Sequence, residues 1–448
     1  MKTYSSYTDS KIDWVGEIPS HWNLNKIKYI FFQRKEKNDP IQTDNILSLT
    51  IQQGVIPLSE KKSGGNKPKD DMSKYNLTYP GDIVLNSMNV IVGSVGLSEY
   101  FGVVSPVYYI LKQIKSEDKI KYFEKLFRTE IFQKSLIGLG NGILIKKTES
   151  SGKLNTIRMR IPMDKLNQVV IPHPPIPEQT QIVSFLDTKT QKIDELIEKT
   201  EKKIDLLKEK RTSLINHCVT KGLNPDVEMK DSGVEWIGEI PSHWGFKKNS
   251  YLCDNMISGP FGSSLKKEFY TKTGYKIYGQ EQVIKDDFEY GDYFISEEKF
   301  QELKRCQIFT NDILISCVGT FGKISLVPKI FKKGIINPRL LKITCNDLIL
   351  PNYFLILLRS EISFTQFELL SRGGTMGVIN LDILRRLKFP LPPKDEQIRI
   401  VEYLDEQTQK IDSTIEKDTQ RTELLKEYRQ SLISEVVTGK VDVREWNG

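Results

Sequence analysis

The chain has few cysteines and no long apolar run, and both absences limit the classes of protein to which it can belong. Its five cysteines form no Cys-x-x-Cys pair, which argues against a zinc ribbon or a disulfide framework and is typical of a reducing compartment. A membrane-spanning helix needs about 18 consecutive apolar residues, and the sequence has no such run. The polar segment 1–12 lacks the apolar core of an export signal. We therefore expect a cytoplasmic protein without membrane contact.

Sequence motifs that hold a cofactor or a nucleophile are missing as well. There is no GxxxxGK[ST], no GxSxG and no HExxH. A DNA amino-methyltransferase holds its flipped base with Asn-Pro-Pro and an aromatic residue, and the nearest segment, residues 337–340 (NPRL), lacks the second proline and the aromatic. We therefore predict no cofactor, no metal and no active site. A dispersed carboxylate nuclease site has no fixed spacing and stays open as an alternative.

Positive charge is unevenly distributed along the chain, although the net charge is only +7. Residues 22–177 contain 23 Lys and Arg against 14 Asp and Glu, and residues 244–393 contain 21 against 15. These segments therefore carry +9 and +6, while the rest of the chain carries −8. Two basic blocks are what phosphate binding requires, although solvated surface lysines would give the same count.

Two short boxes repeat almost unchanged. Residues 10–22 read SKIDWVGEIPSHW and residues 232–244 read SGVEWIGEIPSHW, so nine of thirteen positions are identical. Each box contains a histidine, His21 or His243, which we expect to have only aromatic and apolar neighbours, and no carboxylate follows at the spacing of a known triad. We interpret the boxes as packing motifs that dock the lobes onto helices, not as catalytic sites.

A longer segment also repeats. Residues 178–220 align without a gap with residues 396–438 and agree at 24 of 43 positions. Neither copy contains proline or glycine, each follows a proline cluster, and each ends near a glycine, Gly222 or Gly439. The pattern predicts two helices of about 60 Å each.

Both predicted helices carry an apolar stripe with a seven-residue repeat. A single helix cannot bury such a stripe, so we expect the two copies to pack against each other. The predicted packing residues are Leu186, Ile193, Ile197, Ile204, Leu207, Leu214, Leu404, Ile411, Ile415, Leu425 and Leu432. Thr200 and Asp418 interrupt the repeats at equivalent positions, either as a device that sets the register or as tolerated polar residues.

The lobes between the repeats, residues 23–173 and 245–391, share almost no sequence similarity, yet both contain glycine-punctuated polar segments. Glycine lets the backbone approach a phosphate, and polar side chains beside it can reach base edges, although ordinary loops have the same composition. The candidate DNA-binding residues are Thr50, Gln52, Gln53, Asn86, Ser87, Asn89, Asn141, Lys146, Lys147, Ser258, Phe261, Ser263, Ser264, Lys266, Lys267, Tyr278, Gln280, Thr320, Lys323, Arg339, Arg372 and Thr375. Charge reversal at Lys266 with Lys267, or at Lys332 with Lys333, is expected to weaken DNA binding.

Together these motifs resemble the specificity subunit of type I restriction–modification enzymes. The resemblance rests on the paired W(V/I)GEIPSHW boxes, on the two helices with EQ, IV-x-(F/Y)LD and QKID, and on segments 258–266 (SGPFGSSLK) and 312–323 (DILISCVGTFGK), and it covers residues 10–440. It implies two target-recognition domains, each reading one half of a split DNA site. It also implies that methyltransferase subunits, two in number, dock on the scaffold and that an endonuclease and translocase subunit joins later. The first lobe departs from the SGxFGSSL pattern.

We therefore predict an α+β fold in which two α/β-mixed recognition domains are separated by two long antiparallel coiled-coil helices, with an internal pseudo-two-fold repeat. The predicted parts are residues 1–175 (first domain), 176–222 (first helix), 223–393 (second domain) and 394–448 (second helix and tail). The predicted function is non-catalytic recognition of double-stranded DNA, with the helices setting the spacing between half-sites. The alternatives are a coiled-coil adaptor that does not bind DNA and a stand-alone DNA methyltransferase or nuclease.

Overall fold

The chain forms two compact units. The computed structural model describes residues 2–51, 53–61, 71–143, 158–235, 237–317, 323–371 and 379–447. Unit 1 consists of residues 1–201 with 420–448, and unit 2 consists of residues 202–419. Each unit therefore combines one lobe with a stretch of both repeated helices. None of the helices in these ranges has the length and apolar character needed to cross a bilayer.

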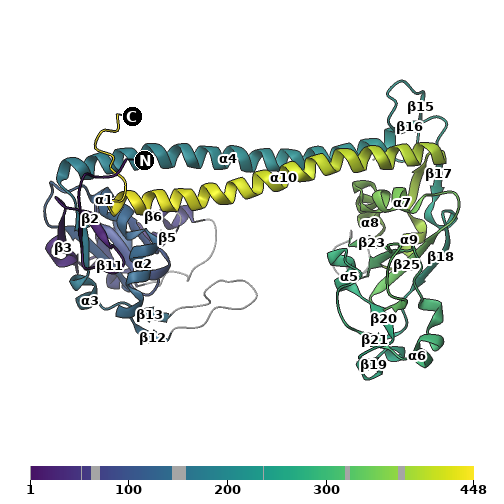
Figure 1. Ribbon diagram of the computed structural model, residues 1–448, viewed down its shortest axis with the longest axis horizontal. Helices are drawn as coiled ribbons and strands as arrows, with labels where there is room; N and C mark the ends of the chain where they lie inside the picture. Colours follow the sequence, from purple (N-terminus) through teal and green to yellow (C-terminus); the bar gives the residue numbers. More distant parts are fainter. Residues whose placement is uncertain are drawn as a thin grey trace. The chain divides into compact units, whose positions relative to one another are not determined.

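The repeated segments form two long helices, α4 (Ile176–Lys221) and α10 (Lys394–Val437), as the sequence predicts. They are the long teal and yellow ribbons in Figure 1. In unit 1, Arg429 of α10 donates to Asp194 of α4 in bonds of 2.8 and 3.0 Å. In unit 2, Arg211 of α4 donates to Asp412 of α10 at 2.9 and 3.2 Å.

Two ion pairs in each unit show that the helices run antiparallel, and in unit 2 the second pair joins Lys203 to Asp418 at 2.7 Å. The aspartates of the two Arg–Asp pairs occupy equivalent positions of the sequence repeat, and so do the two arginines. The same Arg–Asp ion pair therefore forms in both units, with the arginine on α10 in unit 1 and on α4 in unit 2. Within unit 1, a second pair joins Glu201 to Lys426 at 2.8 Å, so that later positions on α4 meet earlier positions on α10. The predicted antiparallel pairing is therefore confirmed within each unit.

The predicted packing residues of both helices are shielded from solvent. Seven are buried: Leu186, Ile193, Ile197, Ile204, Leu404, Ile411 and Leu432. Four are half-buried: Leu207, Leu214, Ile415 and Leu425. Of the two polar residues in the stripes, Thr200 donates to Leu196 O of its own helix at 2.7 Å, whereas Asp418 makes an interhelical ion pair with Lys203 at 2.7 Å. Of these two residues, Asp418 is thus the one that forms an ion pair between the helices.

The two lobes contain the same antiparallel four-stranded sheet, despite their unrelated sequences. In unit 1 the strand order is β4 (Phe31–Arg34), β11 (Tyr108–Gln113), β8 (Ile83–Asn86) and β9 (Val95–Leu97). In unit 2 it is β18 (Cys253–Ser258), β25 (Leu340–Cys345), β22 (Ile313–Ser316) and β23 (Ile324–Leu326). The order and the direction of every pairing correspond, so that each loop of one sheet has a counterpart in the other.

Smaller elements surround each sheet. Those of unit 1 are β1 (Tyr7–Asp9), β2 (Glu17–Pro19), β3 (Asn23–Lys26), β5 (Leu47–Thr50), β6 (Gly54–Pro57), β7 (Asn76–Thr78), β10 (Gly102–Val104), β12 (Asn141–Ile143), β13 (Arg158–Arg160), β14 (Val170–His173), α1 (Ile120–Phe127), α2 (Glu130–Ser135) and α3 (Met163–Gln168). Those of unit 2 are β15 (Met229–Asp231), β16 (Glu239–Pro241), β17 (Gly245–Lys248), β19 (Tyr270–Thr271), β20 (Tyr275–Tyr278), β21 (Phe294–Ile295), β24 (Gly334–Ile336), β26 (Lys388–Leu391), α5 (Gln280–Lys285), α6 (Glu297–Glu302), α7 (Pro351–Arg359), α8 (Glu361–Ser371) and α9 (Leu381–Arg386).

A buried aspartate closes the same turn in both sheets. Asp82 precedes β8 and Asp312 precedes β22, and each accepts a hydrogen bond from the backbone N–H of the aromatic residue three positions earlier, at 2.9 and 2.8 Å. The balancing cation differs, because Arg34 of β4 lies 2.9 Å from Asp82 whereas Lys342 of β25 lies 3.4 Å from Asp312. The turn is thus common to both lobes while its surroundings have diverged.

In unit 1 the repeated box packs against the first turn of α4. The Trp22 indole N–H donates to Glu178 Oε2 at 2.9 Å, and the Tyr4 hydroxyl donates to the same oxygen at 3.1 Å. His21 Nε2 lies 2.5 Å from Glu178 Oε1. Trp22 also belongs to a core that includes Val437 of α10. The box therefore fixes the lobe to both helices.

Unit 2 repeats this clamp. The Trp244 indole N–H donates to Glu396 Oε2 at 2.9 Å, and His243 Nε2 lies 2.6 Å from Glu396 Oε1. Trp244 packs in a core with Val219 of α4. The docking role expected of the boxes is confirmed. The expectation that their histidines have only aromatic and apolar neighbours is wrong, because a glutamate more than 150 positions away in the sequence folds against each ring.

The residue after each glutamate also ties the helix start to its lobe. Gln179 and Gln397 are fully buried. Their side-chain oxygens accept the backbone N–H of Lys119 and of Leu350, both at 2.8 Å. Their amide groups donate to the proline carbonyl five residues earlier, at 2.9 Å in both units. The EQ pair that begins each sequence repeat is therefore a structural anchor.

We expect Glu178→Ala to lower the free energy of unfolding of unit 1 by roughly 3 kcal/mol, because the buried Trp22 and Tyr4 donors lose their acceptor. Glu396→Ala should cost less, roughly 2 kcal/mol, because it strands one buried donor, Trp244. Glu201→Ala, which removes a surface carboxylate, serves as the control and should change stability by less than about 0.5 kcal/mol. Denaturant unfolding of the full chain measures all three, and equal losses in the three variants would contradict the clamp.

A glycine with positive φ follows each long helix and supports the tryptophan of the clamp. Gly439 (φ +76°) would place a Cβ 2.4 Å from Pro19 Cδ, whereas Gly222 (φ +77°) would place one 3.1 Å from Trp244 Cζ2. Gly233 has a similar φ of +71° and open space around it. Substitution at Gly233 should therefore report the cost of backbone strain alone, and substitution at Gly222 or Gly439 should report strain together with steric contact.

We expect Gly233→Ala to cost about 1 kcal/mol of stability through backbone strain alone. Gly439→Ala should cost roughly 3 kcal/mol, because the rigid Pro19 ring must also move. Gly222→Ala should fall between them. Thermal or denaturant unfolding of the three variants checks the order, and a Gly439 variant as stable as the Gly233 variant would show that the close approach is not maintained.

Candidate nucleic-acid interface

Four strands of unit 2 meet at one edge of the lobe, and the polar segments singled out from the sequence lie at this edge. β18, β22 and β20 end here, at Ser258, Ser316 and Tyr278. β25 begins here, at Leu340. We call this region the unit 2 edge, and it comprises residues 258–267, 278–280, 316–317, 323 and 337–340.

Backbone hydrogen bonds join the segments of the unit 2 edge. The N–H of Gly259 donates to Leu340 O at 2.9 Å, and the N–H of Cys317 donates to Arg339 O at 2.9 Å. Burial raises the pKa of the Cys317 thiol to about 11, so that the group stays protonated and uncharged at neutral pH. The edge is therefore a connected backbone surface and not a set of independent loops.

Asn337 is the residue on which these segments converge. Its backbone N–H donates to Tyr278 O at 2.8 Å, and its side-chain oxygen accepts the N–H of Arg339 at 2.9 Å. A Cβ on Gly259 would lie 1.8 Å from Asn337 O, and one on Gly279 would lie 2.6 Å from Asn337 Nδ2. A Cβ at position 259 would clash with backbone and one at position 279 would displace the Asn337 amide, so two of the predicted glycine segments pack directly on this asparagine.

Most of the predicted DNA-binding side chains of the unit 2 edge reach solvent. The exposed ones are Ser258, Phe261, Ser263, Lys266, Lys267, Lys323 and Arg339. Ser264 and Gln280 are half-buried, and the Gln280 amide donates to Ser316 Oγ at 2.5 Å. Four of these exposed side chains are cationic, and one of them, Lys266, lies 3.6 Å from the carboxylate of the exposed Glu268, just beyond the edge. The edge thus presents positive charge, hydroxyl groups and glycine backbone together, which is the chemistry that contacts phosphates and base edges.

Two predicted contact residues are buried and engaged inside their lobes. Tyr278 donates its hydroxyl to Lys332 O at 2.6 Å, and burial raises the pKa of this phenol, so that it remains a neutral donor. Ser87 donates to Val107 O at 2.9 Å. Sequence reasoning selected both because polar residues flank glycine or asparagine there. A strand end turns its side chains alternately inward and outward, and these two point inward.

Unit 1 has the corresponding edge. The N–H of Asn86 donates to Ser94 O at 3.0 Å, which matches the 3.0 Å bond from Ser316 to Lys323 O in unit 2. Asn86 is half-buried and Asn89 is exposed beside it. Asn86 and Asn89 therefore lie at the end of the unit 1 sheet that is equivalent to the unit 2 edge.

The remaining predicted residues of the first lobe lie on the β5–β6 hairpin, on β12 or outside the described residues, and three predicted residues of the second lobe also lie outside the described residues. Thr50 is half-buried and accepts the backbone N–H of the exposed Gln53 at 3.0 Å. For Asn141, which belongs to β12, only the backbone is described. Six predicted residues lie outside the described residues: Gln52, Lys146, Lys147, Thr320, Arg372 and Thr375.

Sequence reasoning missed the role of Asn337. From the sequence alone, we interpret the Asn-Pro dipeptide at 337–338 only as an incomplete methyltransferase motif. The same dipeptide is also a turn signal, and that signal predicts a chain reversal just before a strand. What the sequence could not indicate is that three other segments would pack on the turn.

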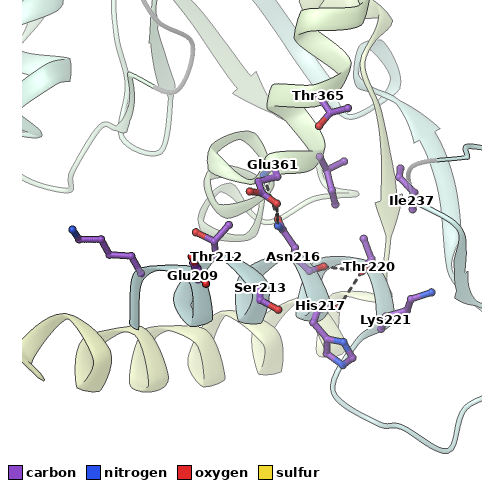
Figure 2. A pocket seen from close by; sticks show the side chains of 12 residues that line it. Glu209, Thr212, Ser213, Asn216, His217, Thr220, Lys221, Ile237, Glu361 and Thr365 are labelled. Carbon is purple, nitrogen blue, oxygen red and sulfur yellow. Dashed lines mark hydrogen bonds between the residues drawn. The ribbon is translucent and has the colours of Figure 1, made fainter. Parts of the chain in front are cut away.

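Unit 2 also has an open groove between α4 and the start of α8, with a volume of about 730 Å³ (Figure 2). It is lined by Lys208, Glu209, Thr212, Ser213, Asn216, His217, Thr220, Lys221, Ile237, Glu361, Ile362 and Thr365. Asn216 holds the two helices together, since its amide donates to Glu361 Oε2 at 2.5 Å and its oxygen accepts the Glu361 N–H at 3.2 Å. The groove is a mixed polar surface on the helical frame, separate from the unit 2 edge.

Comparison with known proteins identifies relatives over nearly the whole chain. The family model for the type I restriction modification DNA specificity domain matches residues 241–426. The chain is 25% identical over 444 residues to a putative type I restriction enzyme MjaX specificity subunit of Methanocaldococcus jannaschii, with 96% of each chain covered. It is 26% identical over 312 residues to the MjaVIII specificity subunit of the same organism, covering 68% of this chain and 70% of the relative.

Solved structures show the same fold. One solved structure superposes with a TM-score of 0.71 at 15% identity, covering 95% of this chain and 99% of the other. Its description concerns the complex assembly and conformational transition of the type I R-M system. The HsdS subunit from Thermoanaerobacter tengcongensis gives a TM-score of 0.56 at 14% identity, covering 95% and 98%. At these identities the likeness concerns the fold alone.

We expect Lys266→Glu combined with Lys267→Glu to weaken binding to double-stranded DNA and to lower the slope of log affinity against log salt by about 0.9 for each phosphate that is no longer neutralised. The control is Lys247→Glu with Lys248→Glu, an exposed pair on β17 near the other end of β18 that changes the net charge equally. Dissociation constants at several salt concentrations measure the slope. Equal slopes in both variants would show that net charge, not the unit 2 edge, governs binding.

The second lysine pair expected from the sequence should matter less. Lys332 lies 3.9 Å from Glu289, and the Lys333 ammonium group lies 5.5 Å from the centre of the Tyr275 ring. Lys266 is paired as well, with Glu268 at 3.6 Å, so the difference between the two pairs rests on position. Lys332 and Lys333 lie before the start of β24, whereas Asn337 of the unit 2 edge follows its end. A charge reversal at Lys332 and Lys333 should therefore change the salt slope less than reversal at Lys266 and Lys267.

Proposed function

We propose that this chain is a specificity subunit of the type I restriction–modification family, a non-catalytic DNA-recognition subunit, and that each unit reads one half of a bipartite, asymmetric DNA site. The observation that carries the proposal is the shared sheet with its equivalent edges. In unit 2 this edge exposes Lys266, Lys267, Lys323 and Arg339 around glycine and serine backbone. In unit 1 the equivalent strand end carries Asn86 and the exposed Asn89.

The difference between the two edges supports two different readings. Arginine and lysine suit the acceptors of guanine, whereas asparagine forms paired hydrogen bonds with adenine. A common sheet with dissimilar edge residues therefore presents unlike chemistry in equivalent positions. Because the two edges differ, the two half-sites should differ, and the complete site should not be a palindrome.

The long helices are proposed to dock methyltransferase subunits, two in number. Leu206 of α4 and Leu424 of α10 occupy equivalent repeat positions and are 64% and 65% exposed. Both lie in the repeated LLKE segment. A large apolar side chain that is exposed at the same place in two otherwise charged helices is suited to a partner that binds twice. The restriction endonuclease and translocase subunit is proposed to join this assembly.

The helices are also proposed to set the spacing between half-sites. The division between the units falls inside both, after residue 201 in α4 and after residue 419 in α10, so each helix continues without a break from one unit into the other. An α-helix advances about 10 Å per seven residues, which corresponds to about 3 base pairs of duplex.

Deleting one heptad from each helix tests this function. Removal of Ile193–Lys199 together with Ile411–Lys417 keeps the apolar stripes in phase, and should shorten the preferred spacer by about 3 base pairs. The half-site sequences should stay the same, because no lobe residue is changed. The measurement is selection of bound sites from a DNA library with randomised half-sites and spacer.

The selection also separates the alternatives. A spacer that is unchanged by the deletion would show that the helices do not set the distance. Half-sites that change would place the reading outside the lobes. An adaptor without DNA contact would select no sequence at all, and a stand-alone enzyme would show activity without any partner subunit.

A further inference from the structure

We propose that Phe261 is a wedge that inserts between neighbouring base pairs of the half-site read by unit 2, unstacks that step and bends the duplex there. The inference rests on the proposed function, because it assumes that the unit 2 edge meets DNA. It adds a mechanical role that hydrogen-bond reading does not require. Proteins that kink DNA do so with exposed Phe, Leu, Ile, Met or Pro side chains.

The first observation is the exposure of this side chain. Phe261 is 80% exposed, although burying a phenylalanine is worth about 2 kcal/mol or more. Single exposed apolar residues are common on protein surfaces, so exposure alone would carry nothing. Its position adds to its exposure, because Phe261 belongs to the unit 2 edge and follows the end of β18.

The second observation is that the chain on both sides of Phe261 is firmly held. Gly259 and Pro260 are buried before it, with Gly259 pressed against Asn337 O. Leu265 is buried after it in an apolar core. The N–H of Ser264 donates to Phe261 O at 2.8 Å and closes a turn between these anchors. A side chain presented on such a support loses little backbone freedom on binding.

The third observation is the charge around the wedge. Lys266, Lys267, Lys323 and Arg339 are exposed on the same edge. An apolar anchor for another protein usually sits in an apolar patch that is depleted of lysine. An apolar tip with cations around it suits a duplex, because the cations meet phosphates while the ring enters the base stack. We therefore commit to DNA as the occupant.

Unit 1 differs at the equivalent place. The segment that follows β4, residues 35–45, contains no aromatic residue. The exposed apolar residue of that segment is an isoleucine, Ile41, which is 66% exposed. The distortion that depends on Phe261 should therefore be confined to the half-site read by unit 2.

The test uses the full-length chain and its selected site, with 2-aminopurine placed at each base step in turn. Unstacking raises the fluorescence of this base. We expect wild-type binding to raise the signal at one step of one half-site. Phe261→Ala should abolish that rise and weaken binding roughly tenfold, as loss of an aromatic stacking partner does elsewhere. Phe261→Leu should retain most of the rise, because leucine is itself a wedge residue.

Tyr251→Ala is the matched control. Tyr251 is an aromatic side chain with 65% exposure that precedes β18, whereas Phe261 follows it, so the control removes a ring from the opposite end of the same strand. It should leave both the affinity and the fluorescence unchanged. Because Phe261 and Tyr251 are exposed, both variants should keep the thermal stability of the wild type.

Three results would overturn the wedge: no fluorescent step anywhere in a site that the wild type binds selectively, the same rise in Phe261→Ala as in wild type, or normal DNA binding by Phe261→Ala with weakened association of a methyltransferase subunit. The last result would make Phe261 a protein anchor. In all three cases sequence-selective binding persists and the proposed function stands. If the wild type selects no DNA sequence at all, the proposed function itself fails.

Discussion

The glutamate at the start of each long helix is the contact on which the arrangement of each unit depends. Glu178 accepts hydrogen bonds from Trp22 and Tyr4, and Glu396 accepts one from Trp244. A carboxylate is favourable in the first turn of a helix, where the backbone N–H groups are unpaired and the helix dipole is positive. The same charge thus stabilises the helix start and holds the box. The lobe and its helix are thereby fixed at one point in both units.

This arrangement separates a constant frame from variable edges. Clamp, helix pair and four-stranded sheet recur in both units, and even the buried aspartate of the sheet recurs, although its cation is Arg34 in one lobe and Lys342 in the other. The interior therefore accepts different partners for the same turn, provided that the buried charge stays paired. Edge residues carry no such constraint and are free to differ. Two unlike readings can be placed on one scaffold without changing how it folds.

The unit 2 edge, proposed to read DNA, is firmly supported. Loops that contribute contact residues are held by the backbone of Asn337, and Gly259 and Gly279 allow the close approach. A side chain such as Phe261 can act mechanically only because its backbone cannot retreat. Bending a duplex costs several kcal/mol, which a mobile loop would not transmit. The proposed distortion of the DNA therefore requires a rigid edge.

The sequence by itself determined the repeats, the two helices, their apolar stripes and the resemblance to a known family, because helical periodicity and repeated motifs are local and survive without knowledge of the fold. It also identified the segments that gather at the edges. The tertiary structure decided the rest. Only pairing between distant strands brings Glu178 to His21, 157 positions apart, and turns Tyr278 and Ser87 inward. The local sequence pattern indicates which residues alternate along a strand, but contacts with distant parts of the chain determine which face of the strand is buried.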